Sequence, residues 1–227
     1  MSYLLRLVVP DKPGILGAVA TALGAAGIDI VSLDVLERGS GVAVDDIVVD
    51  LPAGRLPDSL ITAAHTVPGV SVESLRPFAG PLDTHRELEV LDALARAAEG
   101  TSAKLLAAEL PRVFHSGWAV VLSVVDTPAA GPATWEVTAA SEAAPAFEGL
   151  TLPWMPLTGP RLLPSEEDWL PERWRDMAIE MMAAPYGGPG CAVVLGRSGG
   201  PAFRRSELLR LAHLTGIATT VASLPPV

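Results

Sequence analysis

The chain has 227 residues, of which 49% are hydrophobic and 19% are charged, and its formal net charge is −10. That composition supplies enough apolar material for folded cores and too little charge for a disordered chain. The first 78 residues carry five basic and nine acidic side chains, and neither half shows a basic stripe. The charge pattern therefore argues against nucleic acid and against an anionic membrane as partners.

The single cysteine, Cys191, excludes an intramolecular disulfide, and the apolar run around it predicts a buried, inert thiol. The N-terminus lacks the basic start and cleavage site of a signal peptide. The longest uncharged apolar stretch, residues 13–28, contains four glycines and is too short to span a bilayer. We therefore expect a cytoplasmic protein.

The first 78 residues predict six elements in the order strand, helix, strand, strand, helix, strand. Four strands are predicted. Residues 28–37 and 70–75 alternate between apolar and polar, residues 3–9 are apolar with Arg6 as their only charge, and residues 42–51 have a β-rich centre beside two acidic residues. Apolar residues at helical spacing predict a helix that begins at Pro13 and ends near Gly27, and a shorter helix from Asp58 to Ala64. This order is that of the ferredoxin-like βαββαβ fold, a four-stranded antiparallel sheet with both helices on one face.

Two short motifs in this region resemble the signature of the ACT domain family. The sequence Val-Val-Pro-Asp-Lys-Pro-Gly-Ile-Leu at residues 8–16 resembles a first strand that meets a D-x-P-G turn, and Gly-Ile-Asp-Ile at residues 27–30 resembles the entry to the second strand. The resemblance covers about a third of the chain. It implies a regulatory module that binds a small metabolite, in particular an amino acid, and that forms a homodimer with the ligand at the interface.

The residues of these motifs also suit such a ligand chemically. Gly14 lets a ligand approach the backbone closely, and the free amides of Ile15, Leu16 and Gly17 at a helix N-terminus favour a carboxylate. Asp29, at the start of the next strand, would meet an ammonium group. The candidate ligand-binding residues are Asp11, Pro13, Gly14, Ile15, Leu16, Gly27, Asp29 and Ile30. A domain that only dimerises would contain the same residues, so that alternative stays open.

A linker at residues 79–86 and a second domain at residues 87–227 follow. Helices are predicted at residues 84–99 and 103–114, strands at 118–125, 134–139, 177–184 and 191–196, and a final helix that begins near Ser206. Six prolines forbid long elements between residues 140 and 176.

Residues 177–223 resemble the end of a GAF domain, in which a strand that ends at Pro precedes a turn, a Gly-led strand, an anchoring Phe and a terminal helix. The resemblance implies an α/β domain with a central antiparallel sheet, over which the irregular segment closes a pocket. Four tryptophans are the candidates for a second pocket: Trp135, Trp154, Trp169 and Trp174. The same rings equally suit loop anchoring and core filling, and the hallmark of a cyclic-nucleotide site is absent, so no cofactor is expected.

No nucleophile elbow, phosphate loop, dinucleotide fingerprint or metal-binding His spacing occurs in the sequence. The chain is therefore predicted to be an α+β regulatory protein, with a ferredoxin-like ACT domain at residues 1–78 and a GAF-like domain at 87–227, and not an enzyme. Two alternatives remain: a module that only assembles with itself or with another regulator, and a small-molecule enzyme that uses the pocket of the second domain.

Overall fold

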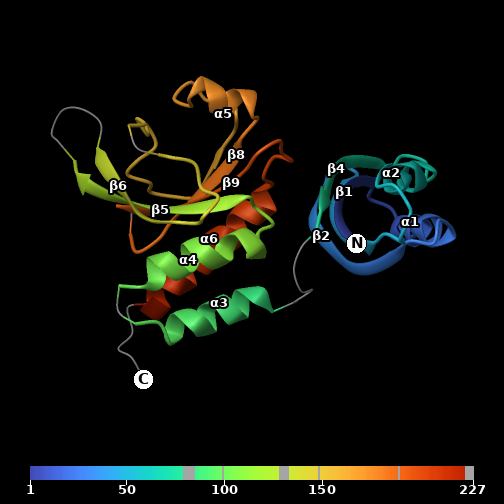
Figure 1. The fold of residues 1–227 in the computed structure, drawn as a ribbon, viewed down its shortest axis with the longest axis horizontal. Coiled ribbons are helices and arrows are strands. Elements are labelled where there is room, and N and C mark those ends of the chain that lie inside the picture. Colours follow the sequence, from blue (N-terminus) through green and yellow to red (C-terminus); the bar gives the residue numbers. More distant parts are fainter. Residues whose placement is uncertain (79–84, 99, 128–132, 148, 189, 223–227) are drawn as a thin grey trace. The chain divides into compact units, whose positions relative to one another are not determined.

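The computed structural model describes residues 1–78, 85–98, 100–127, 133–147, 149–188 and 190–222. The chain divides into two compact units, Met1–Asp83 and Thr84–Val227 (Figure 1). Most of the predicted linker, residues 79–84, lies outside the described residues.

The N-terminal unit has the predicted ferredoxin-like architecture. Its elements in chain order are β1 (Ser2–Pro10), α1 (Ile15–Ala25), β2 (Asp29–Gly39), β3 (Val42–Asp50), α2 (Asp58–His65) and β4 (Ser71–Pro77). The strands form one antiparallel sheet in the order β2-β3-β1-β4. Both helices pack on the same face, where Val19, Leu23 and Leu60 meet Leu7 and Ile47 in a single core.

The two ends of α1 show why the helix lies where it does. Gly14 has φ 85°, in the left-handed region that favours glycine, and α1 begins at Ile15 rather than at the predicted Pro13. At the other end, the amide of Gly27 donates to the carbonyl of Gly24, and the amide of Ile28 donates to that of Leu23. These two bonds form a Schellman motif with Gly27 at positive φ, which confirms Gly27 as the residue that ends the helix.

The C-terminal unit has three layers (Figure 1). Its elements are α3 (Arg86–Ala95), α4 (Ser102–Val113), β5 (Trp118–Asp126), β6 (Thr134–Ala140), β7 (Arg161–Leu163), α5 (Glu172–Asp176), β8 (Glu180–Pro185), β9 (Cys191–Arg197) and α6 (Arg205–Ala222). The antiparallel sheet has the order β6-β5-β9-β8-β7. Helices α3, α4 and α6 cover one face, and the Pro-rich segment with α5 covers the other.

Strand β5 supplies both hydrophobic cores of this unit, as its nearly uninterrupted apolar run predicts. Ala119 and Val121 face the helices, and Val120 and Leu122 face the Pro-rich segment. All four side chains are buried.

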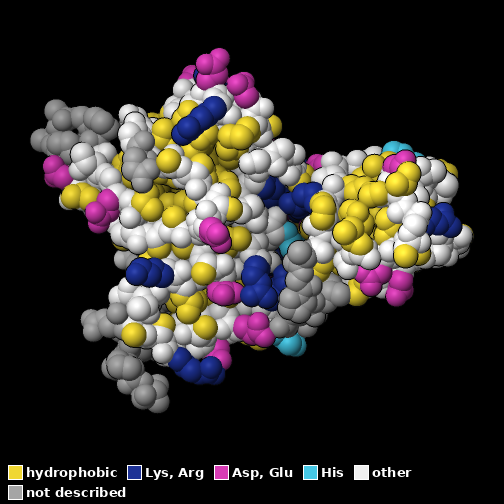
Figure 2. Space-filling view, in the orientation of Figure 1, with side chains coloured by type: hydrophobic (Ala, Val, Ile, Leu, Met, Phe, Trp, Pro, Cys, Tyr) yellow, Lys and Arg dark blue, Asp and Glu magenta, His cyan; other side chains and the backbone are white. Residues whose placement is uncertain are grey.

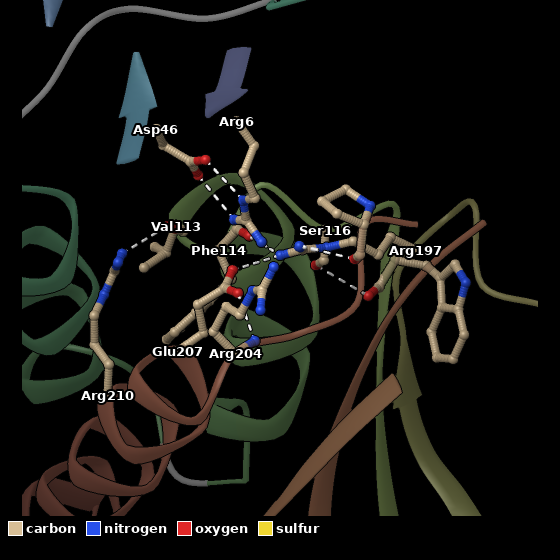
Figure 3. A network of polar contacts seen from close by, with 11 residues as sticks. Arg6, Asp46, Val113, Phe114, Ser116, Arg197, Arg204, Glu207 and Arg210 are labelled. Carbon is tan, nitrogen blue, oxygen red and sulfur yellow. Dashed lines mark hydrogen bonds and ion pairs between the residues drawn. The ribbon is translucent and has the colours of Figure 1, made fainter. Parts of the chain in front are cut away.

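A buried ion pair joins strand β9 of the sheet to helix α6 and to Phe114, the residue that follows α4 (Figure 3). Arg197, at the end of β9, contacts Glu207 of α6 at 2.7 Å and donates to the carbonyl of Phe114 at 3.1 Å. The other carboxylate oxygen of Glu207 accepts from the amide of Arg204 at 2.8 Å, at the start of α6. The Arg197 guanidinium also lies 3.8 Å from the ring centroid of Phe203.

Charged side chains on the surface are mixed in sign. On the face shown in Figure 2, Lys and Arg side chains lie in separate groups with acidic side chains between them. This distribution agrees with the absence of a basic stripe in the sequence.

The close packing of β5 against β9 gives a first prediction. A Cβ atom at Gly196 would overlap with the Cζ2 and Cε2 atoms of the Trp118 ring. We therefore expect Gly196→Ala to lower the free energy of unfolding by about 1–3 kcal/mol, the usual cost of overpacking a core, measured by urea denaturation. Gly216→Ala is the matched control, because no atom lies within 4 Å of its Cβ position in α6. That control should raise stability by about 1 kcal/mol. A Gly196 variant as stable as its control would contradict this packing.

Candidate functional site

A cavity of about 430 Å³ lies in the N-terminal unit, beside the turn between β1 and α1. Its lining comes from four elements and the turn: Val9, Pro10, Asp11, Lys12, Pro13, Gly14, Ile15, Leu16, Gly17, Val35, Arg38, Ala43 and Asp45. Most of this lining is apolar, and the volume falls within the usual range for small-molecule sites.

Asp45 is the polar group that distinguishes this cavity. It lies in β3 on the sheet face that the helices cover, paired with Leu7 of β1 and Val35 of β2. Only 1% of its surface is exposed, and neither carboxylate oxygen has a hydrogen-bond partner among the described residues. Burial raises the pKa of Asp45 above its ordinary value of 3.8; Arg38 opposes this shift, and Asp46 and Asp11 add to it.

Arg38 and Asp11 form an ion pair at the edge of the cavity. The Arg38 guanidinium donates from Nε to Oδ1 of Asp11 at 3.1 Å and also contacts this oxygen through Nη2. The hydrogen bond to Asp11 raises the pKa of Arg38, so the guanidinium stays charged. Asp11 is thus engaged with Arg38 and does not cap α1.

The N-terminus of α1 borders the same cavity. The amides of Leu16 and Gly17 belong to the first turn, where a helix has no carbonyl of its own to accept from them. The residue before the helix, Gly14, makes no side-chain cap and leaves this end open. The amide of Asp11 donates to the carbonyl of Gly41 at 2.9 Å, which fixes the turn against the β2–β3 hairpin. The arrangement provides amide donors and a positive helix end, which together favour an anion.

Five of the eight residues predicted for this site line the cavity: Asp11, Pro13, Gly14, Ile15 and Leu16. The other three do not. Gly27 ends α1 at its far end, and Asp29 and Ile30 begin β2.

Asp29 lies at the opposite end of the sheet from the turn. It pairs with Asp50, which pairs with Ser2, whereas Pro10 pairs with Val42 at the other end of β3. Ser2 and Pro10 are about 25 Å apart at the usual rise of a strand. Within one chain, Asp29 and Gly14 therefore lie too far apart to bind the same small ligand. Strand β3 is antiparallel to both β1 and β2, so β1 and β2 run in the same direction. The start of β2 therefore lies at the same end of the sheet as the start of β1, and the turn lies at the other end.

The predicted set of residues lacked Asp45 and Arg38. The sequence of β3 contains a signal for Asp45, because Ala43, Asp45, Ile47 and Val49 share a face and only one of them is charged. A single charge on an apolar strand face marks a buried group that needs a partner. Both Asp45 and its neighbour Asp46 are buried.

Asp46 lies on the opposite face of the sheet. Its carboxylate accepts two hydrogen bonds from Arg6, from Nε to Oδ1 and from Nη2 to Oδ2, each 2.8 Å long (Figure 3). Both carboxylate oxygens of Asp46 thus accept a hydrogen bond from a guanidinium, whereas neither oxygen of Asp45 does.

Two of the four tryptophans of the C-terminal unit are buried in its core. Trp174 is buried against Trp118 and Phe147, with ring centroids 6.2 and 5.1 Å away. Trp154 is also buried, with its ring centroid 5.9 Å from that of Trp169. Trp135 lies beside an open groove of about 490 Å³ along β6. Trp154 and Trp174 therefore fill the core, as the alternative to a second pocket predicts.

Other candidate chemistry in the chain is limited. Cys191 is half-buried, with its sulfur 3.2 Å from the hydroxyl of Ser123. Within the described ranges, His, Cys, Asp and Glu side chains form no group of three or more that could hold a metal ion. The helices of the described ranges include none that combines the length and the apolar character needed to cross a membrane.

The geometry of the N-terminal unit agrees with a comparison to known families. The fold is a βαββαβ sandwich with a ligand-sized cavity at its first turn, and residues 3–69 match the family model described as ACT domain. The N-terminal region is an ACT domain. No curated protein sequence matches the chain.

Several solved structures are similar to parts of the chain. An ACT domain protein from Streptococcus pneumoniae is 16% identical, with a TM-score of 0.28, over 34% of this chain and 88% of that one. A formyltetrahydrofolate deformylase from Pseudomonas putida KT2440 is 14% identical, with a TM-score of 0.27, over 41% of this chain and 37% of the deformylase. A protein of unknown function from Galdieria sulphuraria is 19% identical, with a TM-score of 0.30, over 59% and 76% of the two chains.

The unpaired carboxylate of Asp45 gives a second prediction. A raised pKa means that folding disfavours the ionised form, so the stability present at low pH is lost as the pH rises from the ordinary value towards the raised one. We expect Asp45→Asn to raise the free energy of unfolding of the ligand-free protein at pH 7 by about 1–3 kcal/mol. The gain should vanish below the ordinary pKa of 3.8, where both side chains are neutral. Denaturation as a function of pH tests this prediction, and destabilisation at pH 7 would contradict it.

Proposed function

We propose that this chain is a non-catalytic regulatory protein whose ACT domain binds an amino acid in the cavity beside the β1–α1 turn. The observation that carries the proposal is the placement of an open helix N-terminus on an apolar cavity of about 430 Å³. ACT domains bind small-molecule ligands such as amino acids in regulation, and the five predicted residues that line the cavity belong to the motif of that family.

The carboxylate of the ligand is proposed to bind the amides of Leu16 and Gly17. Backbone amides that point out of the first turn, together with the helix dipole, stabilise a negative charge in a partly buried site. Gly14 has nothing within 4 Å of the position that a Cβ atom would occupy, so a ligand can approach the backbone there.

We further propose that the ACT domain forms a homodimer through the edge of β2. This strand is at one edge of the sheet and carries a stripe of exposed apolar side chains. They are Val31, Leu33 and Val35, whose exposed fractions are 37%, 38% and 48%. An exposed edge with apolar side chains is a surface for pairing with another strand. Two antiparallel β2 strands would lay the start of one beside the end of the other, so Asp29 would approach the cavity of the partner subunit.

For the C-terminal unit we propose a GAF-like fold. Its order of two helices, two strands, an irregular segment, two strands and a final helix supports this assignment, with the short β7 and α5 inside the irregular segment. The groove beside Trp135 is the candidate for a second binding surface.

The proposed carboxylate site gives a third prediction. Gly17→Glu places a carboxylate at the first turn of α1, where it competes with the ligand for the same amides. The variant should fold at least as well as the natural protein, since a helical glycine is replaced and the charge suits the helix end. We expect isothermal titration calorimetry with free amino acids to show binding by the natural protein and a loss of at least tenfold in affinity for the variant.

Ala20→Glu is the matched control for this experiment. It adds the same charge to an exposed position of α1 that does not line the cavity. Binding should be kept in the control. Equal binding by the two variants would contradict the carboxylate site. The failure of every common amino acid to bind at millimolar concentration would contradict the proposed function.

The proposed dimer gives a fourth prediction. Leu33→Lys introduces charge into the apolar stripe of β2, so we expect the dimer to dissociate to monomers in size-exclusion chromatography with light scattering. Leu56→Lys, at a position that is 69% exposed in the loop before α2, is the control and should stay dimeric. A natural protein that is monomeric at all concentrations would exclude the dimer.

A further inference from the structure

Two acidic and two basic side chains line the cavity, but neither basic side chain donates a hydrogen bond to Asp45. Two carboxylates, Asp11 and Asp45, and one guanidinium, Arg38, lie within electrostatic range of one another. Arg38 is bonded to Asp11 and its side chain is 66% exposed. Lys12 also lines the cavity, but it is exposed and is not among the charges that act on Asp45. Among the described residues, no cationic group donates a hydrogen bond to Asp45.

An unpaired buried carboxylate is costly for the folded protein. Moving a charged group out of water is unfavourable unless hydrogen bonds or an opposite charge replace the lost hydration. The two nearest neighbours of Asp45 across the strands, Leu7 and Val35, offer neither. The raised pKa of Asp45 reflects the same desolvation. A cationic group entering the cavity would restore a charge-assisted hydrogen bond to a group that is already desolvated.

Resting on the proposed function, we infer that Asp45 receives the ammonium group of the ligand and thereby determines specificity. The cavity then has a receptor for each end of a zwitterion, with the amides of α1 for the carboxylate and Asp45 for the amine. Its walls, from Val9, Pro13, Ile15, Val35 and Ala43, suit an apolar side chain. The preferred ligands are therefore amino acids with apolar side chains, in preference to 2-hydroxy acids of the same shape.

This role is the one that the sequence motif suggested for Asp29. Within one chain, Asp29 is at the wrong end of the sheet, whereas Asp45 lines the cavity itself. The inference is independent of dimerisation, since every group it uses belongs to one N-terminal unit.

The experiment compares matched pairs of ligands on the full-length protein. L-valine, L-leucine, L-isoleucine and L-methionine are each titrated beside the 2-hydroxy acid with the same side chain, by calorimetry at pH 7. For the natural protein we expect at least one amino acid to bind about 10–100-fold more tightly than its hydroxy acid, as loss of a hydrogen bond to a charged group implies. In Asp45→Asn the affinity for that amino acid should fall by a similar factor, and the preference over the hydroxy acid should disappear.

Asp34→Asn is the matched control, because Asp34 is exposed in β2 and pairs with Asp46 on the other sheet face. It should keep both the affinity and the preference. Equal binding of amino and hydroxy acids, or an Asp45→Asn variant with unchanged affinity, would overturn the inference and leave the carboxylate site intact. If none of the eight compounds binds, both the inference and the proposed function for apolar amino acids fail. Thermal unfolding of Asp45→Asn checks that a loss of binding is not a loss of folding.

Discussion

The backbone conformation of Gly14 is the constraint on which the N-terminal unit depends. With φ at 85°, the chain reverses from β1 into α1 within four residues, and no side chain caps the helix. The helix therefore presents its first-turn amides beside the ends of β1, β2 and β3. The hydrogen bond from Asp11 to Gly41 and the ion pair of Asp11 with Arg38 hold the turn in this position. A residue with a Cβ atom would be strained there, and the cavity depends on the turn being tight.

Local patterns were sufficient for the fold of this unit. Alternation in the strands, helical spacing in α1 and the glycine at its end each specify an element through short-range physics, and the order of elements then restricts the topology. The same reasoning located the turn and the five residues of the cavity that are close in sequence. It failed for Asp29, because whether two residues meet across a sheet depends on strand direction and register, which no local pattern contains.

Asp45 shows a second limit of sequence reasoning. The two-residue period of a strand puts it on one face with Ala43, Ile47 and Val49, but its lack of a hydrogen-bond partner depends on the paths of β1, β2 and α1. In the C-terminal unit, the clustering of tryptophans in the sequence suggested a single site. The structure instead distributes them between the core and the edge of β6, because the Pro-rich segment must cover a whole sheet face and needs large rings to fill the space.

The buried pair of Arg197 and Glu207 has a consequence for how the C-terminal unit unfolds. Through the contacts of these two side chains, Phe114 after α4, the end of β9 and the start of α6 share a single polar network. The last helix cannot peel away alone, since its departure would remove from Arg197 the carboxylate that lies 2.7 Å away in a buried setting. Unfolding of α6 is therefore coupled to unfolding of the sheet, because β9 contributes Arg197 to the shared contact. We therefore expect amide hydrogen exchange to detect a common opening free energy for the helical layer and the strands.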